Sequence, residues 1–213
     1  MKNTLIILGL ILIPHISLDA QNFEIGIKTG FGLADTHWTN IPNIERNSDF
    51  HSPTFSFSAN GVLSYKSADF WGFTLEPGIV KKGWIDKGIN FKNKFKVNYI
   101  QLPILSDFYL SNKLILSIGP EVSYRLNSKY ISEHGTEKVN YIFNNFELSG
   151  AVGITYKIVE NFDIGIRYSH GITQASDRIF WVYDEFDAEV LETNDYNQYL
   201  HLFIKMKLKN LRL

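Results

Sequence analysis

The chain of 213 residues contains no cysteine, no excess of charge of either sign, and no apolar run long enough for a membrane-spanning helix. Without cysteine there is neither a disulfide framework nor a residue that can carry a lipoprotein anchor. With 21 Lys and Arg against 22 Asp and Glu, the net charge is −1 and no basic stripe stands out, which argues against nucleic acid as a partner. A spanning helix needs about 20 apolar residues. Residence in a membrane, if it occurs, must therefore use strands.

The longest apolar run, residues 5–13, lies at the amino end of the chain. Lys2 precedes this run, and Pro14 ends it shortly before Ala20. A basic residue, a short apolar run and a small residue at the cleavage position are typical of a secretory signal peptide. We predict a signal peptide over residues 1–20. The remaining length of about 190 residues fits one domain, over residues 21–213.

Apolar residues alternate with small, polar or charged ones over residues 114–127, and residues 146–157 repeat this pattern. Successive side chains of a strand point to opposite faces, so each segment has one apolar and one polar face. Each segment is also longer than the roughly 9–11 residues with which a tilted strand crosses a bilayer. The pattern predicts membrane-crossing strands.

Strands of this kind can be placed along the whole chain. They lie at 22–34, 53–65, 69–82, 95–110, 113–127, 145–157, 162–173 and 196–208. Tight connections at 66–68, 111–112 and 158–161 alternate with long ones at 35–52, 83–94, 128–144 and 174–195. Such alternation is typical of a barrel with short turns on one rim and long loops on the other. The sequence therefore predicts an all-β fold: an eight-stranded antiparallel up-and-down transmembrane β-barrel after an N-terminal signal peptide.

Alternation alone does not say which face points outward, because a soluble lipocalin-like barrel would reverse the two faces. The polar face is rich in glycine and serine, which suits the crowded interior of a small barrel. It also carries charges of both signs, which we predict to form a closely paired interior network. These residues are Lys28, Glu76, Glu121, Arg125, Glu147, Arg167 and Lys205. Side chains of this kind roughly fill an eight-stranded barrel, so an open pore is not expected.

Aromatic residues make up 15% of the chain, and many fall near the ends of predicted strands. In a membrane barrel such rings form girdles at the two interfaces. The residues are Trp38, Phe70, Trp71, Trp84, Tyr109, Tyr130, Tyr141, Phe162 and Trp181. An ordinary aromatic-rich β core is the alternative interpretation.

Four segments carry a resemblance to a known family. They are residues 99–105 (YIQLPIL), 119–124 (GPEVSY), 150–153 (GAVG) and 167–173 (RYSHGIT). In order and spacing they resemble the PorT-like outer-membrane β-barrel proteins of Bacteroidetes. The resemblance implies an integral barrel of the cell outer membrane and, as for a few relatives, a part in protein secretion or gliding. It implies no catalytic activity.

Ser169 and His170, with Asp177 further along, are the nearest match to the groups used by barrel enzymes that act on lipid A. Neighbouring residues of a strand face opposite sides, so Ser169 and His170 cannot pair directly. We expect His170 to face lipid or an aromatic neighbour. We predict no enzyme activity, no catalytic or metal-binding residues and no cofactor.

Lysine dominates one long loop and its flanks, with Lys81, Lys82, Lys87, Lys92, Lys94 and Lys96. We hypothesise that Lys82, Lys87 and Lys92 attract the phosphates of lipopolysaccharide, with a solvated loop as the alternative.

Acidic residues dominate the long loop at 174–195, which contains seven carboxylates and one basic residue, Arg178. Their spacing does not match an EF-hand, so a solvated acidic loop is favoured over a calcium site. Aromatic residues among the acids favour a protein-contact surface that includes Trp181, Tyr183, Asp184 and Glu185.

The sequence as a whole predicts an exported outer-membrane barrel with a structural or interaction role in the envelope, as an accessory to protein secretion or surface assembly. Its expected partners are outer-membrane lipid, lipopolysaccharide and an envelope protein that contacts the long loops. A narrow channel for small solutes, a lipid A-modifying enzyme and a soluble periplasmic lipocalin-like carrier are the alternatives.

Overall fold

The computed structural model describes residues 23–39, 51–67, 69–87, 92–183 and 188–211. The predicted signal peptide lies outside these ranges. No helix in the described part of the chain is long and apolar enough to cross a membrane.

Strands make up almost all of the regular structure. Their bounds are β1 Phe23–Thr39, β2 His51–Lys66, β3 Trp71–Leu75, β4 Gly78–Lys87, β5 Lys92–Tyr109, β6 Leu114–Ser132, β7 Gly135–Lys138, β8 Phe146–Val159, β9 Phe162–Gly171, β10 Ser176–Tyr183 and β11 Ala188–Leu211. A short 3-10 helix, η3 (Asn140–Ile142), lies between β7 and β8.

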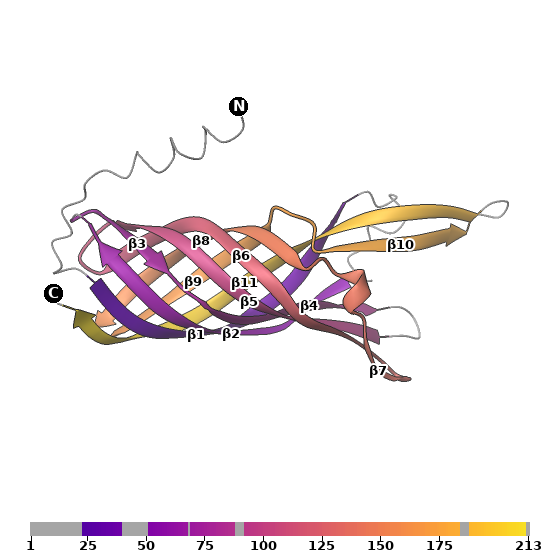
Figure 1. The fold of residues 1–213 in the computed structure, drawn as a ribbon, viewed down its shortest axis with the longest axis horizontal. Helices are drawn as coiled ribbons and strands as arrows, with labels where there is room; N and C mark the ends of the chain where they lie inside the picture. Colours follow the sequence, from indigo (N-terminus) through magenta and orange to yellow (C-terminus); the bar gives the residue numbers. More distant parts are fainter. Residues whose placement is uncertain (1–22, 40–50, 68, 88–91, 184–187, 212–213) are drawn as a thin grey trace, which may run out of the picture.

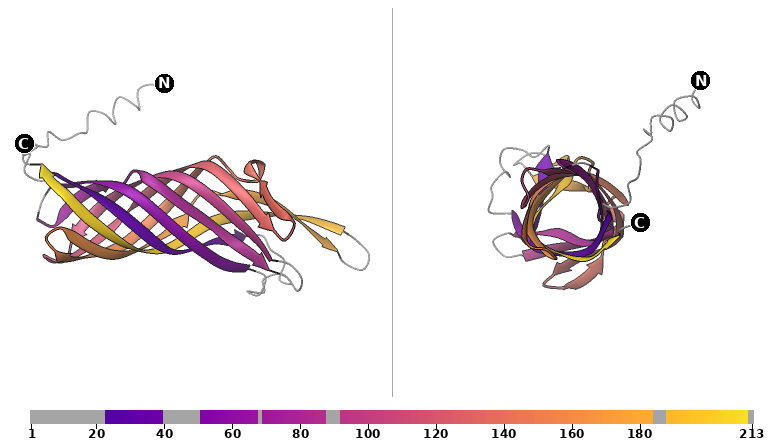
Figure 2. Two further views of the ribbon diagram at one scale, coloured as in Figure 1. Left: turned by 90° about the horizontal axis from the view of Figure 1, so that it is seen from below. Right: turned by 90° about the vertical axis from the view of Figure 1, so that its left-hand side faces the viewer.

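The strands close into a ring, which is seen end-on in Figure 2. Around the ring, β1 pairs with β2, β2 with β3 and β4, both of these with β5, and β5 with β6. The ring continues through β8 and β9 to β11, which pairs with β1. All of these pairings are antiparallel. With β3 and β4 sharing one place, the described strands form an eight-stranded up-and-down barrel, which confirms the predicted fold class.

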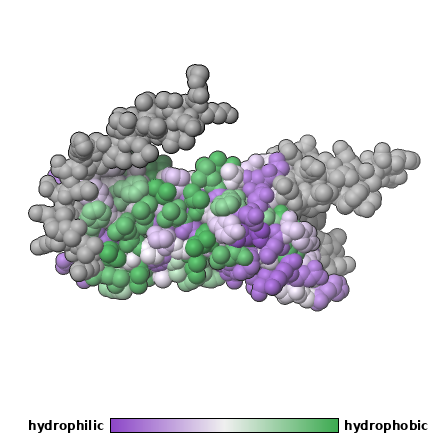
Figure 3. Space-filling view, in the orientation of Figure 1, coloured by the Kyte–Doolittle hydropathy of each residue, from purple (hydrophilic) through white to green (hydrophobic). Residues whose placement is uncertain are grey.

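The polar face of each strand points into the barrel and the apolar face points out. On β6, Ile118 and Leu126 are exposed, whereas Glu121 and Ser123 are buried. On the face in view, the space-filling picture shows apolar surface on the barrel wall, giving way to hydrophilic surface toward the end that carries β7 (Figure 3). A soluble carrier with reversed faces is therefore not what this chain forms.

The predicted strand at 69–82 is broken in two. Pro77 has no N–H for the ladder, and Pro103 lies on the facing strand, so regular pairing stops between β3 and β4. The backbone N–H of Glu76 still donates to the Pro103 carbonyl at 3.1 Å, and that of Gly61 to the Pro77 carbonyl at 2.8 Å. The pairing register with β5 is the same on both sides of the interruption, so Glu76 keeps the inward position that strand alternation gives it.

The long-loop end extends further than the sequence indicated. Two of the predicted loops contain paired strands: β7 pairs with the end of β6, and β10 with the start of β11. The β10–β11 hairpin projects well past the barrel rim (Figure 1). The turns that join β3 to β2, β5 to β6 and β8 to β9 lie at the opposite end, together with the start of β1 and the end of β11.

Not all of the predicted girdle residues lie on the outer surface. Phe70, Tyr141 and Phe162 are exposed, but Trp84 is fully buried in the lumen. Tyr109 lines a cavity at the turn end. These two rings occupy inward positions of β4 and β5, where the alternation of the strand outweighs their place near its end. The side chains of Trp38 and Trp181 lie outside what the structure describes.

Candidate functional site in the barrel lumen

One buried ion cluster is built around Glu76 at the break between β3 and β4. Arg167 on β9 binds its carboxylate with both terminal nitrogens, from Nη1 to Oε2 at 2.5 Å and from Nη2 to Oε1 at 3.0 Å. Lys28 on β1 donates to the same carboxylate. All three side chains are at most 4% exposed. Two cations share one carboxylate, so this cluster carries an excess positive charge.

A second buried cluster has the opposite balance. Lys82 Nζ on β4 lies 2.9 Å from Glu147 Oε1 and 3.3 Å from Glu121 Oε1. Asn197 Nδ2 donates to Glu147 Oε2 at 2.6 Å, and Ser169 Oγ to Glu121 Oε2 at 3.4 Å. Taken together the two clusters match three cations with three carboxylates. Charges taken out of water are tolerated only when paired and hydrogen-bonded in this way.

An aromatic cap closes the lumen beyond Lys82, toward the long loops. Trp84 stacks on Phe95 with ring centroids 4.8 Å apart, and Phe143, just before β8, packs on both rings. Val139 and Phe143 are almost completely buried in the same cluster. The segment around η3 therefore folds over the end of the barrel, and no continuous water path is expected through the cap.

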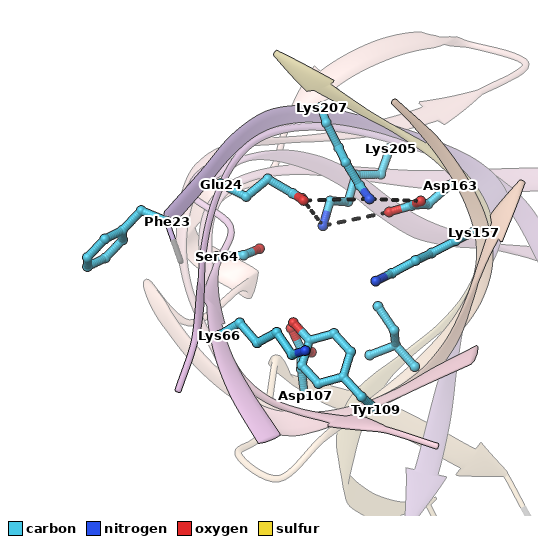
Figure 4. Close-up of a pocket in the computed structure, with 11 residues that line it drawn as sticks. Phe23, Glu24, Ser64, Lys66, Asp107, Tyr109, Lys157, Asp163, Lys205 and Lys207 are labelled. Atoms are coloured by element: carbon cyan, nitrogen blue, oxygen red, sulfur yellow. Dashed lines mark ion pairs between the residues drawn. The ribbon is translucent and has the colours of Figure 1, made fainter. Parts of the chain in front are cut away.

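The turn end, in contrast, holds a cavity of about 200 Å³. Its charged lining comes from both termini of the barrel sheet and from β2, β5, β8 and β9 (Figure 4). The charged residues are Glu24, Lys66, Asp107, Lys157, Asp163, Lys205 and Lys207. Lys205 pairs with Glu24 at 2.7 Å, and Lys207 with Asp163 at 3.4 Å. The lumen is therefore a cup that is open at the turn end and closed at the loop end.

The comparisons with known proteins agree with this architecture. A family model described as outer membrane protein beta-barrel domain matches residues 19–177. The chain belongs to this family. Membership in the outer membrane protein beta-barrel domain family, together with the outward apolar face, implies that this barrel resides in the outer membrane.

Solved barrels resemble the chain at low sequence identity. Neisserial surface protein A is 14% identical, with 87% of this chain and 97% of that one covered and a TM-score of 0.49. OprG from Pseudomonas aeruginosa is 13% identical, with 89% and 97% covered and a TM-score of 0.46. Ail of Yersinia pestis is 13% identical, with 87% and 99% covered and a TM-score of 0.43. These likenesses assign no activity to this family member, and no curated protein matches its sequence.

The lumen of this outer-membrane barrel contains most, but not all, of the charges chosen from the sequence. Lys28, Glu76, Glu121, Glu147 and Arg167 form the two central clusters, and Lys205 lies apart at the turn-end cavity. Arg125 does not join them. It bonds instead to Asn145 Oδ1 at 2.5 Å on the rim. A β-bulge at Leu126 interrupts the register beside Arg125, and the chain entering β8 offers closer acceptors.

Several interior groups were not found from the sequence, and Lys82, His201 and Asp163 are among the most buried of them. Lys82, the last residue of the predicted strand at 69–82, was assigned to the loop surface, yet it is 1% exposed at the centre of the lumen. Continued alternation of β4 through Val80, Lys82 and Trp84 was the signal that could have found it. His201, which packs between the rings of Tyr199 and Phe203, occupies an inward position of β11, and Asp163 occupies one of β9.

The serine and histidine considered for lipid A chemistry lie on opposite sides of the barrel wall. Ser169 is buried and bonds to Glu121, whereas His170 faces outward, 3.2 Å from the hydroxyl of Tyr168. The side chain of Asp177 is not among those described. Within the described residues, no group of three or more His, Asp or Glu side chains is placed to hold a metal ion.

The structure describes only some residues of the predicted loop surface. Lys87 and Lys92 face each other across β4 and β5 and are exposed. Trp181 and Tyr183 lie on β10, opposite Val190 and Ala188, but their side chains are outside what the structure describes. Asp184 and Glu185 lie outside the described residues altogether.

Proposed function

We propose that this chain is a non-catalytic outer-membrane protein whose function lies in contacts made by its long-loop end. The observation that carries the proposal is the contrast between the two parts of the barrel. The lumen is filled by balanced ion clusters and an aromatic cap, whereas β6–β7 and β10–β11 continue as paired strands beyond the rim. Paired strands beyond the rim suit recognition, and the filled lumen does not suit transport.

The two alternative functions have less support. A channel needs continuous interior water, but the side chains of Lys82, Glu121 and Glu147 are each at most 1% exposed in the middle of the lumen. A lipid A-modifying enzyme needs its serine and histidine side by side, whereas Ser169 and His170 face opposite sides of the wall.

The PorT-like resemblance supports a more specific role, as an accessory to protein secretion or surface assembly. In this role the long-loop end faces the cell exterior and the turn end, with the cavity, faces the periplasm. Tyr141 on η3 is 86% exposed at the long-loop end, where an envelope protein could bury its ring.

Site-specific photo-crosslinking in living cells tests this proposal. A photoreactive amino acid is placed at His134 or Tyr141 at the long-loop end, and at Asp69 or Lys113 at the turn end. All four positions are exposed, so reagent access is matched. We expect a discrete protein adduct from the long-loop positions and none from the turn positions. If the long-loop positions give no adduct, the proposed interaction role is wrong.

A further inference from the structure

Lysines occupy directly opposed positions on three neighbouring strands at the long-loop end. Lys96 on β5 faces Lys129 on β6, and Lys129 faces Lys138 on β7. In an antiparallel sheet, directly opposed residues share a face, with Cβ atoms about 4.5–5.5 Å apart. Three ammonium groups therefore stand in one row across the sheet.

This row lies on the outer wall of the barrel. The next pair along the ladder, Val97 and Ser128, is fully buried and points inward, so Lys96 and Lys129 point outward. The bulge at Leu126 sets this register. It adds one residue to β6, so the outward positions are even-numbered up to Tyr124 and odd-numbered from Asn127 to Lys129.

Two further lysines adjoin the row on the same outer face. Lys94 lies two residues beyond Lys96 on β5, and Lys81 faces Asn98 on β4. Lys96 is close enough to both for its charge to repel theirs. We call these five residues the lysine face: Lys81, Lys94, Lys96, Lys129 and Lys138.

No carboxylate neutralises the lysine face within the described residues. None of its five members forms an ion pair there, and the two nearest acids of these strands belong to the opposite face of the sheet. Those acids are Asp86, which lies beside inward Trp84 and Phe95 in the ladder, and Glu137, which faces Tyr130. Like charges placed directly opposite each other destabilise a sheet. An external anion would remove this cost.

The position of the lysine face along the barrel indicates which anion this is. Immediately below it, toward the turn end, the outward residues become apolar: Ile79 and Ile100 on β4 and β5, then Tyr124 on β6, all exposed. Lysines directly above an apolar wall match the phosphate level and the acyl level of a membrane lipid. The same sequence of surfaces is seen along the barrel in Figure 3.

We propose that the lysine face binds the phosphate groups of lipopolysaccharide in the outer leaflet, with the acyl chains lying on the apolar wall below. This differs from the loop site expected from the sequence, because Lys82 points into the lumen and Lys96, Lys129 and Lys138 form the centre of the site. The inference rests on the orientation proposed above, with the long-loop end at the cell surface, but it does not require a protein partner.

Binding of purified lipid A to the detergent-refolded full barrel is the decisive experiment. The test variant combines Lys96→Gln, Lys129→Gln and Lys138→Gln, and the matched control combines Lys66→Gln, Lys113→Gln and Lys157→Gln at the turn end. We expect the test variant to bind phosphorylated lipid A at least about tenfold more weakly than the wild type, since each lysine contributes to attraction at an anionic surface. The control variant, which loses the same charge, should bind as the wild type does.

Two further ligands identify the chemistry that is recognised. Lipid A without its two phosphates should bind the wild type and the test variant equally weakly. Inorganic phosphate should compete with phosphorylated lipid A only weakly, because it lacks acyl chains. Equal binding of the two lipid A forms, or unchanged binding by the test variant, would overturn the proposal. Full competition by inorganic phosphate would also overturn it, since the site would then recognise a free anion.

Thermal unfolding in detergent separates a ligand site from a structural one. Because the lysines repel one another, removing them should leave the melting temperature of the lipid-free barrel unchanged or higher, and only the wild type should gain stability when phosphorylated lipid A is added. A variant that melts lower without lipid would show that the lysines stabilise the barrel itself and would contradict the proposal. The triple Lys→Arg variant should retain binding. These experiments use purified protein, so their outcome is independent of the crosslinking result.

Discussion

At the scale of single residues, the buried charges are the most demanding feature of this barrel. Lys82 is the only cation within bonding distance of both Glu121 and Glu147 among the described residues, and all three side chains are essentially without solvent. Each partner is therefore needed by the others, and removal of one leaves a charge that neither water nor another side chain can compensate.

Lys82→Met tests this dependence. The substitution keeps the length of the side chain but leaves two carboxylates without their cation, so we expect a loss of about 3–5 kcal/mol in the free energy of unfolding. Urea unfolding in vesicles, followed by tryptophan fluorescence, measures it. Lys81→Met, one residue away on the outer wall, is the control and should change stability by less than about 0.5 kcal/mol. Equal stability of the two variants would show that the cluster contributes little.

Close packing at glycine is the second residue-scale feature. A Cβ atom on Gly165 would lie 2.3 Å from Cζ of Phe203 and 2.5 Å from the Ile154 carbonyl oxygen. The Phe203 ring cannot easily move aside, since Lys28 and Arg167 both lie over it, at 4.8 and 5.5 Å from its centroid. This glycine therefore makes room for the ring beside the first ion cluster.

Gly165→Ala should accordingly destabilise the barrel by about 1–3 kcal/mol through overpacking. Gly61→Ala is the matched control, because its new methyl group would meet no atom nearer than 3.8 Å. The midpoint of urea unfolding compares the two variants. A Gly165→Ala protein that unfolds with the wild type would mean that the lumen has more free space than the packing indicates.

At the scale of elements, the ring and its extensions contribute differently to stability. The ring strands pair on both sides, whereas β10 pairs only with β11, from Ser176 opposite Asp195 to Tyr183 opposite Ala188. A two-stranded ribbon has little stability of its own. We conclude that the hairpin depends on the barrel, but that the barrel does not depend on the hairpin.

Replacing residues 178–193 by a short glycine-serine turn tests this conclusion. The truncated protein retains the bond from Ser176 Oγ to Asp195 Oδ2 at 2.7 Å, so the base of the hairpin stays anchored. We expect the unheated sample to migrate as a folded barrel in gel electrophoresis and to shift on boiling, as we also expect of the full chain. Loss of the folded band would show that the hairpin is needed for closure of the ring.

At the scale of the whole molecule, the barrel is closed at the long-loop end, filled by side chains at its centre and open at the turn end. The aromatic cap and the ion clusters are stacked along its axis, and a cavity of about 200 Å³ lies at the turn end. The closed wall provides the membrane anchor, and the functional surfaces lie outside the lumen.

The purified barrel should therefore show no steady ion conductance in planar lipid bilayers. A water-filled porin measured in the same bilayers is the positive control, and heat-modifiable migration of the sample shows that the inserted protein is folded. Stable single-channel steps from the folded protein would contradict a closed lumen and would favour the transport alternative.

The sequence by itself determined the strands, their alternation of short and long connections, and which residue types face lipid. These features follow from local rules, since side chains alternate along any strand and a bilayer requires an apolar outer face. Six of the seven charges chosen from the sequence face the lumen or its turn-end cavity, because each occupies an inward position of an alternating strand, and Arg125 is the exception.

Only the tertiary structure decided which charges meet and where each face ends. The bulge at Leu126 changes the register of β6 and places Lys129 on the outer wall, and Arg125 is held on the rim by its bond to Asn145. The predicted strand ended at Lys82, and only the continued pairing of β4 with β5 to Lys87 shows that Lys82 lies inside the barrel. Contacts across a barrel join strands far apart in the chain, so their partners depend on closure and register, which no local pattern encodes.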